Sequence, residues 1–127
     1  MTVGLTSGGR QNMIELILLM TGHTLADYFL QDSDMIRDKR EYGLNTAVFH
    51  SGIHAAFTFI VLTFFVNSWF AIFLAIGNGL VHYHIDWAKA QIDYKYSLDP
   101  DSQGFWMLHG TDQFAHFLTL ALIVSAI

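Results

Sequence analysis

The sequence predicts an all-α protein, an integral membrane four-helix bundle with up-down-up-down topology. The composition is 53% hydrophobic and only 13% charged, whereas a typical soluble domain is roughly 25% charged. Residues 42–85 contain no Asp, Glu, Lys or Arg, which leaves room for two spans of about 20 residues each. After residue 101, Asp112 is the only charged side chain. These long uncharged runs favour helices that cross a bilayer.

The elements follow from composition along the chain. Residues 1–10 are polar and contain glycine, which predicts a flexible N-terminal tail, and residues 11–127 form a single four-helix transmembrane domain. A helix is expected over residues 11–30, because its middle is apolar. The charged residues 31–45 predict a loop or a short interfacial helix. A second apolar run predicts a helix over residues 46–66.

Two further helices complete the expected bundle. An apolar run predicts the third helix over residues 69–88. The polar residues 89–103 include the only proline and predict a loop. Asp101 or Ser102 can cap the fourth helix, which is expected over residues 104–127.

Charge indicates the orientation and excludes some partners. The two polar loops carry five of the six Lys and Arg residues, so the positive-inside rule places these loops in the cytoplasm and both termini outside. A net charge of -5 argues against nucleic acid as a partner. The absence of cysteine excludes disulfides and thiolate metal sites. The lipid bilayer is the expected partner, and the small size of the bundle leaves open whether it forms a homo-oligomer.

Ionisable side chains recur four residues apart near one end of every expected helix. This spacing places two side chains on the same helix face, and antiparallel connections bring the four ends to one side of the bundle. Ionisable groups within a membrane are costly and usually functional. We therefore predict a metal site formed by four pairs: His23 and Asp27, His50 and His54, His82 and Asp86, and Asp112 and His116.

The residue types indicate which ions the site would hold. Imidazole with carboxylate suits zinc best, with iron or manganese as alternatives. Eight candidate ligands exceed the three or four that one tetrahedral zinc uses. Either two ions lie close together, or one ion is bound and the other side chains orient its ligands. Gln31, Gln113 and His109 are expected to hydrogen-bond to the ligands, whereas His84, two residues from His82, faces away from them.

A catalytic site of this composition would perform metal-dependent hydrolysis. A divalent ion activates water and polarises a phosphoryl or acyl oxygen. Asp27, Asp86 and Asp112 are the candidate catalytic residues, either as ligands or with one of them as general base. A position near the membrane surface indicates a lipid-linked or amphipathic substrate.

Other functions fit the same residues. The side chains could form a transport pathway or relay for protons or metal ions, although the outer half of the bundle offers no ionisable group apart from Glu15. They could also form a polar packing cluster in a phage-type structural protein or in a modulator of the host membrane. Paired histidines could also bind haem.

The combined order of motifs resembles a known family. The motifs are H-x-x-x-D-x-x-x-Q from His23 to Gln31, then H-x-x-x-H, then H-x-x-x-D, and finally D-Q-x-x-H from Asp112 to His116. Over about residues 14–120 the pattern resembles the uncharacterised family called domain of unknown function 3307, small membrane proteins of bacteria and their phages. The resemblance implies a place in the bacterial inner membrane and brings no established activity. A looser similarity to membrane-bound proteins thought to be metal-dependent hydrolases adds modest support for hydrolysis.

Overall fold

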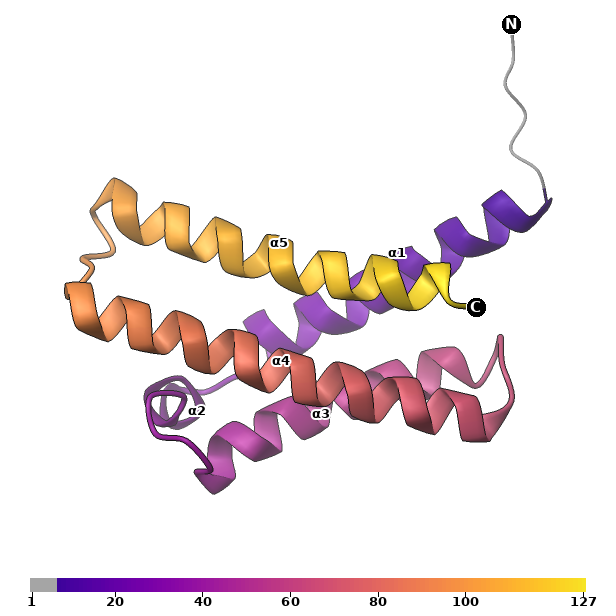
Figure 1. Ribbon diagram of the computed structural model, residues 1–127, viewed down its shortest axis with the longest axis horizontal. Coiled ribbons are helices and arrows are strands. Elements are labelled where there is room, and N and C mark those ends of the chain that lie inside the picture. Colours follow the sequence, from indigo (N-terminus) through magenta and orange to yellow (C-terminus); the bar gives the residue numbers. More distant parts are fainter. Residues whose placement is uncertain (1–6) are drawn as a thin grey trace, which may run out of the picture.

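The computed structural model describes residues 7–127 and contains five helices and no strand within that range (Figure 1). The all-α class is therefore confirmed, and residues 31–45 contain a short helix, which was one of the two expected outcomes. Residues 1–6 of the expected tail lie outside the described residues. The helices are α1 (Ser7–Tyr28), α2 (Ser33–Asp38), α3 (Asn45–Leu62), α4 (Ser68–Tyr96) and α5 (Gln103–Ser125).

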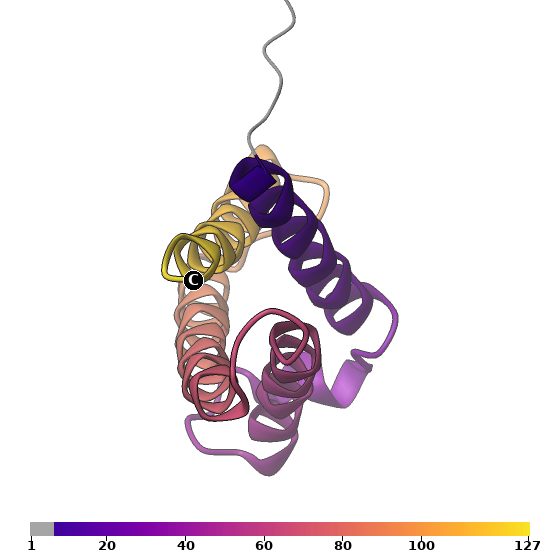
Figure 2. The same cartoon turned by 90° about the vertical axis from the view of Figure 1, so that its right-hand side faces the viewer.

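Each long helix packs against two of the other three. α1 contacts α3 and α5, and α4 contacts the same two helices, which gives the ring seen end-on in Figure 2. Consecutive long helices run in opposite directions, so the ends of α1 and α4 meet the starts of α3 and α5 (Figure 1). This end also carries α2, and we call it the polar end. The C-terminus lies at the opposite end, which we call the apolar end.

Short polar side chains fix the starts of three helices. Asp32, Asn67 and Ser102 each accept a hydrogen bond from the backbone N–H three residues ahead, at 2.8, 3.0 and 3.2 Å respectively. Such caps satisfy N–H groups that have no partner within the helix. Of the two candidates for the start of α5, Ser102 is therefore the cap.

The boundaries of α1 and α3 differ from those expected. α1 begins at Ser7 instead of residue 11, so part of the expected tail is helical. α3 ends at Leu62 instead of residue 66, and the chain then turns before α4. The start of α1 is polar and the segment after α3 is apolar, so composition predicted a tail and a longer helix. Composition alone does not determine where a helix begins or ends.

The expected loop at residues 89–103 is wrong for its first half, because α4 continues to Tyr96. Residues 89–96 are polar but contain neither Gly nor Pro, and residues such as Ala, Lys and Gln are good helix formers. The residue after α4, Ser97, adopts the left-handed conformation with φ 47° and so turns the chain away from the helix.

The two ends of the bundle bury different side chains. The polar end buries histidine and carboxylate groups. The apolar end is packed by aliphatic side chains from all four long helices, and these are Leu19, Leu62, Ala71, Leu120, Ile123 and Val124.

Among the described residues, α3 is the one helix long enough and apolar enough to span a bilayer by length and composition alone. A buried core helix can satisfy the same criterion, so this finding does not confirm the expected four spans. α1, α4 and α5 each carry ionisable residues from the buried polar group, which lowers their hydropathy.

Candidate metal centre

The four long helices each contribute one pair of predicted ligands to the interior of the polar end. At most 8% of any of these eight side chains is exposed. The pairs lie near the ends of α1 and α4 and near the starts of α3 and α5. The structure thus brings together all eight predicted ligands: His23, Asp27, His50, His54, His82, Asp86, Asp112 and His116.

Three of the pairs make contact along their own helix, as a spacing of four residues allows. In each contact the histidine presents its Nε2 atom to the carboxylate. The distances between Nε2 and the carboxylate oxygen are 3.2 Å for His23 and Asp27, 3.2 Å for His82 and Asp86, and 3.5 Å for His116 and Asp112.

Contacts between helices form a first group, the four-ligand group, of Asp27, His50, His54 and His82. Its ligand atoms all lie within 4.8 Å of one another. Asp27 Oδ1 lies 3.2 Å from His50 Nε2 and 3.0 Å from His54 Nε2. His82 Nε2 lies 3.7 Å from Asp27 Oδ1 and 3.3 Å from His50 Nε2. Zinc bonds of about 2.0–2.1 Å would place tetrahedral ligands about 3.3–3.4 Å apart, so this donor set fits a four-coordinate zinc.

A second group, the three-ligand group, consists of Asp86, Asp112 and His116. His116 Nε2 lies 3.3 Å from Asp86 Oδ1 and 3.5 Å from Asp112 Oδ1, again close to the tetrahedral spacing. The two groups are adjacent, because the rings of His82 and His116 stack with their centroids 4.1 Å apart. Three protein ligands leave one tetrahedral position for water or substrate.

His23 lies between the two groups. With His82 and His116 it forms a third set whose ligand atoms lie within 4.8 Å. This set shares members with both of the other groups, so the three sets do not correspond to three separate ions. The geometry accommodates either one ion or two, as the number of candidate ligands suggested.

Gln113 connects α5 to the carboxylates of the centre. Its amide nitrogen donates hydrogen bonds to Asp27 Oδ2 at 3.0 Å and to Asp112 Oδ2 at 3.2 Å. Its amide oxygen lies 3.2 Å from His23 Nε2. Gln113 therefore contacts one carboxylate from each ligand group, and these are the hydrogen bonds that an orienting role would require.

Gln31 contacts the centre differently from what the sequence suggested. Its amide nitrogen donates to the backbone carbonyl of Asp27 at 3.3 Å instead of contacting the carboxylate. Its amide oxygen accepts a hydrogen bond from Lys39, and Lys39 Nζ lies 2.8 Å from Asp86 Oδ2. Sequence reasoning missed Lys39, because it lies outside the long helices and has no spacing relation to Asp86.

His109 contacts Lys89 and Tyr28. The Lys89 ammonium donates to His109 Nδ1 at 3.1 Å, so the ring proton lies on Nε2 and points to Tyr28 Oη, 3.0 Å away. Lys89 Nζ also lies 3.5 Å from Asp112 Oδ2. Sequence reasoning missed Lys89 too, although it follows Asp86 by three residues and so shares its helix face.

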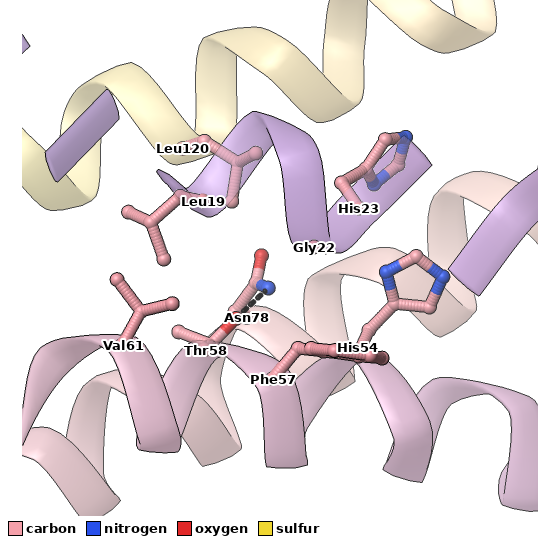
Figure 3. A pocket seen from close by; sticks show the side chains of 9 residues that line it. All are labelled: Leu19, Gly22, His23, His54, Phe57, Thr58, Val61, Asn78 and Leu120. Carbon is pink, nitrogen blue, oxygen red and sulfur yellow. Dashed lines mark hydrogen bonds between the residues drawn. The ribbon is translucent and has the colours of Figure 1, made fainter. Parts of the chain in front are cut away.

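Apolar side chains close the inner side of the centre. Figure 3 shows His23 and His54 beside a narrow pocket that the apolar side chains Leu19, Val61 and Leu120 also line. The pocket has no room for a water molecule. The aliphatic core of the apolar end lies beyond it, so the polar groups of the centre stop at this level.

The fold and the site define a class of protein: an all-α protein with a buried group of histidines and carboxylates that can hold a metal ion. A family model described as protein of unknown function (DUF3307) matches residues 15–127, and the chain belongs to this family. The family resemblance noted from the motifs is therefore confirmed. No curated protein and no solved structure matches the chain.

Proposed function

We propose that this protein is an integral membrane enzyme with a metal centre near the cytoplasmic face, and that the centre hydrolyses a lipid-linked or amphipathic substrate. The observation that carries this proposal is the spacing of the ligand atoms. Asp27 Oδ1 and the Nε2 atoms of His50 and His82 lie 3.2 to 3.7 Å apart in the interior of the bundle. Zinc is the favoured ion, with iron or manganese as alternatives.

The burial of so many ionisable groups supports metal binding. Unpaired buried charges are unfavourable unless they are neutralised or coordinate a metal. Three carboxylates meet five histidines in the candidate centre, and the histidine Nε2 atoms point at carboxylate oxygens. A divalent ion would offset the carboxylate charge and would use the histidines as neutral ligands.

The distribution of apolar side chains supports a place in the bilayer. On the outward faces of the long helices, large side chains such as Ile17, Phe73 and Leu122 are exposed, whereas the interior of the polar end is ionisable. This is the reverse of a water-soluble fold, in which contiguous apolar surface is small. A lipid environment would cover these outward faces.

The helix lengths and tryptophans agree with the same proposal. α3 has 18 residues, which corresponds to about 27 Å of helix, close to the roughly 30 Å of a hydrocarbon core. Trp69 at the apolar end is 83% exposed, and Trp106 at the polar end is 60% exposed. Tryptophan is enriched at both membrane–water interfaces, so these two side chains would mark the two boundaries.

The two ligand groups support catalysis at one of them. Four protein ligands are typical of a structural zinc site, and three are typical of a catalytic site with an open position. The three-ligand group faces a cavity of about 270 Å³ that Asp27, Asp86 and Asp112 line. A divalent ion held there would supply a Lewis acid that activates water for hydrolysis. The Asp27 carboxylate also lines this cavity, which gives it access to water as a general base.

The alternative of transport has less support. A proton or ion pathway needs polar groups or water through the full depth of the membrane. Beyond the centre, the narrow pocket of Figure 3 and the aliphatic core separate the histidines from the apolar end. The Asn78 amide and the Thr58 hydroxyl extend past the histidines but are paired with each other at 2.8 Å. The buried Glu15 carboxylate of α1 accepts a hydrogen bond from the Gln11 amide at 2.8 Å.

Elemental analysis of the detergent-purified full chain tests the metal centre. We expect stoichiometric metal in the parent and its loss in the His50→Ala/His54→Ala double variant. His84→Ala is the matched control, because His84 is exposed and contacts Tyr42 instead of the centre; it should keep its metal. Asp112→Asn, which preserves side-chain shape, should lower the metal content even if the double variant does not fold. A parent that is folded and free of metal would contradict the proposal and favour a polar packing cluster or a proton relay.

Hydrolysis is tested separately on the metal-loaded parent. Phosphoester and lipid-ester substrates should be cleaved, and a chelator or the Asp112→Asn substitution should abolish cleavage. A loaded protein that cleaves none of these substrates would remove the enzymatic part of the proposal and leave the metal centre in place.

A further inference from the structure

A cavity lies directly on the three-ligand group and extends outward from it. Its inner part, of about 270 Å³, is lined by the carboxylates of the centre. Its outer part, of about 530 Å³, is lined by residues of α2 and the segments that flank it, and by residues of α4 and α5. Six residues line both parts, so the two parts form one continuous space. These residues are Gln31, Ile36, Lys39, Asp86, Lys89 and His109.

Four positive side chains line this cavity. Lys39 and Lys89 line both parts, and Arg37 and Arg40 line the outer part. The lysine side chains are only 14% and 28% exposed, respectively. They are therefore not freely solvated surface charges, and the cavity holds two cations close to the candidate centre.

Each of the two lysines contacts a carboxylate of the three-ligand group. Lys39 Nζ lies 2.8 Å from Asp86 Oδ2, and Lys89 Nζ lies 3.5 Å from Asp112 Oδ2. Gln31 and His109 hold the two ammonium groups from the other side. A divalent cation bound by the same carboxylates would share their negative charge with the lysines.

The charge of the whole cavity then selects the ligand. Its four cationic side chains equal in number its four carboxylates, Asp27, Asp86, Asp93 and Asp112, so a bound divalent ion leaves the space formally dicationic. A doubly charged oxyanion with several acceptor oxygens balances this charge, and a carboxylate with a single charge does not. Lysine is a common phosphate ligand in proteins. The apolar side chains Ile36 and Phe105 of the outer part suit the remainder of an amphipathic molecule.

We infer that Lys39 and Lys89 bind the phosphate group of the substrate, and that this substrate is a phosphate monoester of an amphipathic alcohol. The inference rests on the proposed function and names its substrate class. In the reaction, the oxygen of water bonds to phosphorus as the phosphorus–oxygen bond to the alcohol breaks. One proton of the water ends on the alcohol, and inorganic phosphate is released.

Calorimetric titration of the metal-loaded full chain with inorganic phosphate, the product, tests this inference. We expect Lys39→Met and Lys89→Met each to weaken phosphate binding by about tenfold or more, because each removes a charge-assisted hydrogen bond. Lys39→Arg and Lys89→Arg should retain most of the affinity, which separates loss of charge from misfolding. Lys95→Met is the matched control, since Lys95 is exposed on α4 and lies over Tyr96; its affinity should not change.

The outcomes separate this inference from the proposed function. Loaded protein that does not bind phosphate, or that binds it equally well in both Met variants, overturns the inference and leaves the metal centre intact. If the parent takes up no metal but binds phosphate through Lys39 and Lys89, the proposed function is overturned and the anion site is retained. Metal-free protein that does not bind phosphate overturns both.

The source of the phosphate is decided by a second probe. Lysophosphatidic acid carries a phosphate monoester on a lipid, and it should compete with inorganic phosphate for the same lysines. Tighter binding of lysophosphatidic acid supports the site and a lipid-linked substrate. Equal or weaker binding overturns the amphipathic alcohol as part of the substrate and leaves a site for a water-soluble phosphate.

Discussion

At the scale of single residues, one amide connects the two ligand groups. Gln113 donates to Asp27, which belongs to the four-ligand group, and to Asp112, which belongs to the three-ligand group. A hydrogen bond from the amide to one carboxylate oxygen fixes the orientation of that carboxylate. Partners of this kind fix the orientation of metal ligands and affect affinity without binding the metal.

Gln113→Ala should therefore weaken metal binding about 10-fold to 100-fold without abolishing it. Competition with a chelator of known affinity would measure the change. Gln103→Ala, on the exposed first turn of the same helix, is the control and should bind metal like the parent. Equal affinity in both variants would mean that Gln113 does not position the ligands.

Near the polar end, a hydrogen bond from the Thr46 hydroxyl lowers the pKa of the Asp38 carboxyl below its ordinary value. Arg37 Nε also donates to Asp38, at 2.9 Å. Because both contacts favour the charged form, they stabilise the fold above the pKa of about 3.9 of an unfolded aspartate. The stabilisation is lost as the pH falls through the lowered pKa.

Thr46→Val should raise the pKa of Asp38 toward its ordinary value, because it removes the hydroxyl donor. Titration of the carboxyl carbon by NMR would measure this pKa. Thr63→Val removes a hydroxyl at the other end of α3 that donates to the Ile60 carbonyl, and it should leave the pKa of Asp38 unchanged. An unchanged pKa in both variants would contradict the role of Thr46.

At the scale of elements, glycines set how closely the helices approach. A Cβ atom at Gly79 would lie 3.1 Å from Ala55 Cβ and 3.2 Å from the Ser51 carbonyl oxygen, so α3 and α4 pack closely there. Gly79 precedes His82 by less than one helical turn. The close approach therefore brings the histidines of α3 and α4 within contact distance.

Gly79→Leu should destabilise the protein by at least about 1–3 kcal/mol, because a side chain forced into a packed interface strains it. It should also lower the metal content by moving α4 away from α3. Gly77→Leu is the matched control on the same helix, since a Cβ at Gly77 meets no atom within 4 Å. Thermal unfolding in detergent, followed by circular dichroism, would compare the two. A Gly79→Leu protein as stable as Gly77→Leu would show that close packing is not required.

At the scale of the whole molecule, large apolar side chains lie on the outside of the bundle and ionisable side chains lie inside its polar end. Ionisable groups fill the interior of the polar end, while Ile, Leu and Phe side chains cover much of the outward faces. Water would disfavour both features, and a bilayer with a bound cation would favour both. The membrane proposal and the metal proposal therefore support each other physically, but each can be tested alone.

The chain contains no cysteine, so single cysteines can report the orientation. We expect Ser125→Cys, at the apolar end, to react with a membrane-impermeant maleimide in intact spheroplasts. Asp101→Cys, at the polar end, should react only after the membrane is permeabilised. Equal labelling of both sites in intact spheroplasts, or extraction of the chain by alkaline carbonate, would contradict the proposed topology.

Removal of metal should destabilise the whole bundle, because its ligands come from all four long helices. A ligand present at about 100 times its Kd contributes about 2.7 kcal/mol to the folded state. A chelator should therefore lower the Tm of the parent by an amount that depends on free metal concentration. The His50→Ala/His54→Ala variant should unfold at the same temperature with or without chelator. If neither metal nor chelator changes the Tm of the parent, this result would argue against the metal centre.

The helical class, the approximate positions of the four long helices and the eight residues that meet at the polar end can be predicted from the amino-acid sequence alone. These properties are encoded locally. A spacing of four residues places His82 and Asp86 on one helix face regardless of the rest of the fold, and the short connections between α3 and α4 and between α4 and α5 favour antiparallel neighbours. Polarity was less informative about helix ends, as the extension of α4 to Tyr96 shows.

The pairing of these residues depends on how the helices pack in three dimensions. The division into a four-ligand and a three-ligand group depends on the rotation of each helix about its axis and on the distances between helices, which no local pattern encodes. The contact between Lys39 and Asp86 depends on the path of the segment that contains α2. Residues far apart in sequence become neighbours only when packing fixes the helices relative to one another, and at this level the candidate ligands acquire the spacing of a metal site.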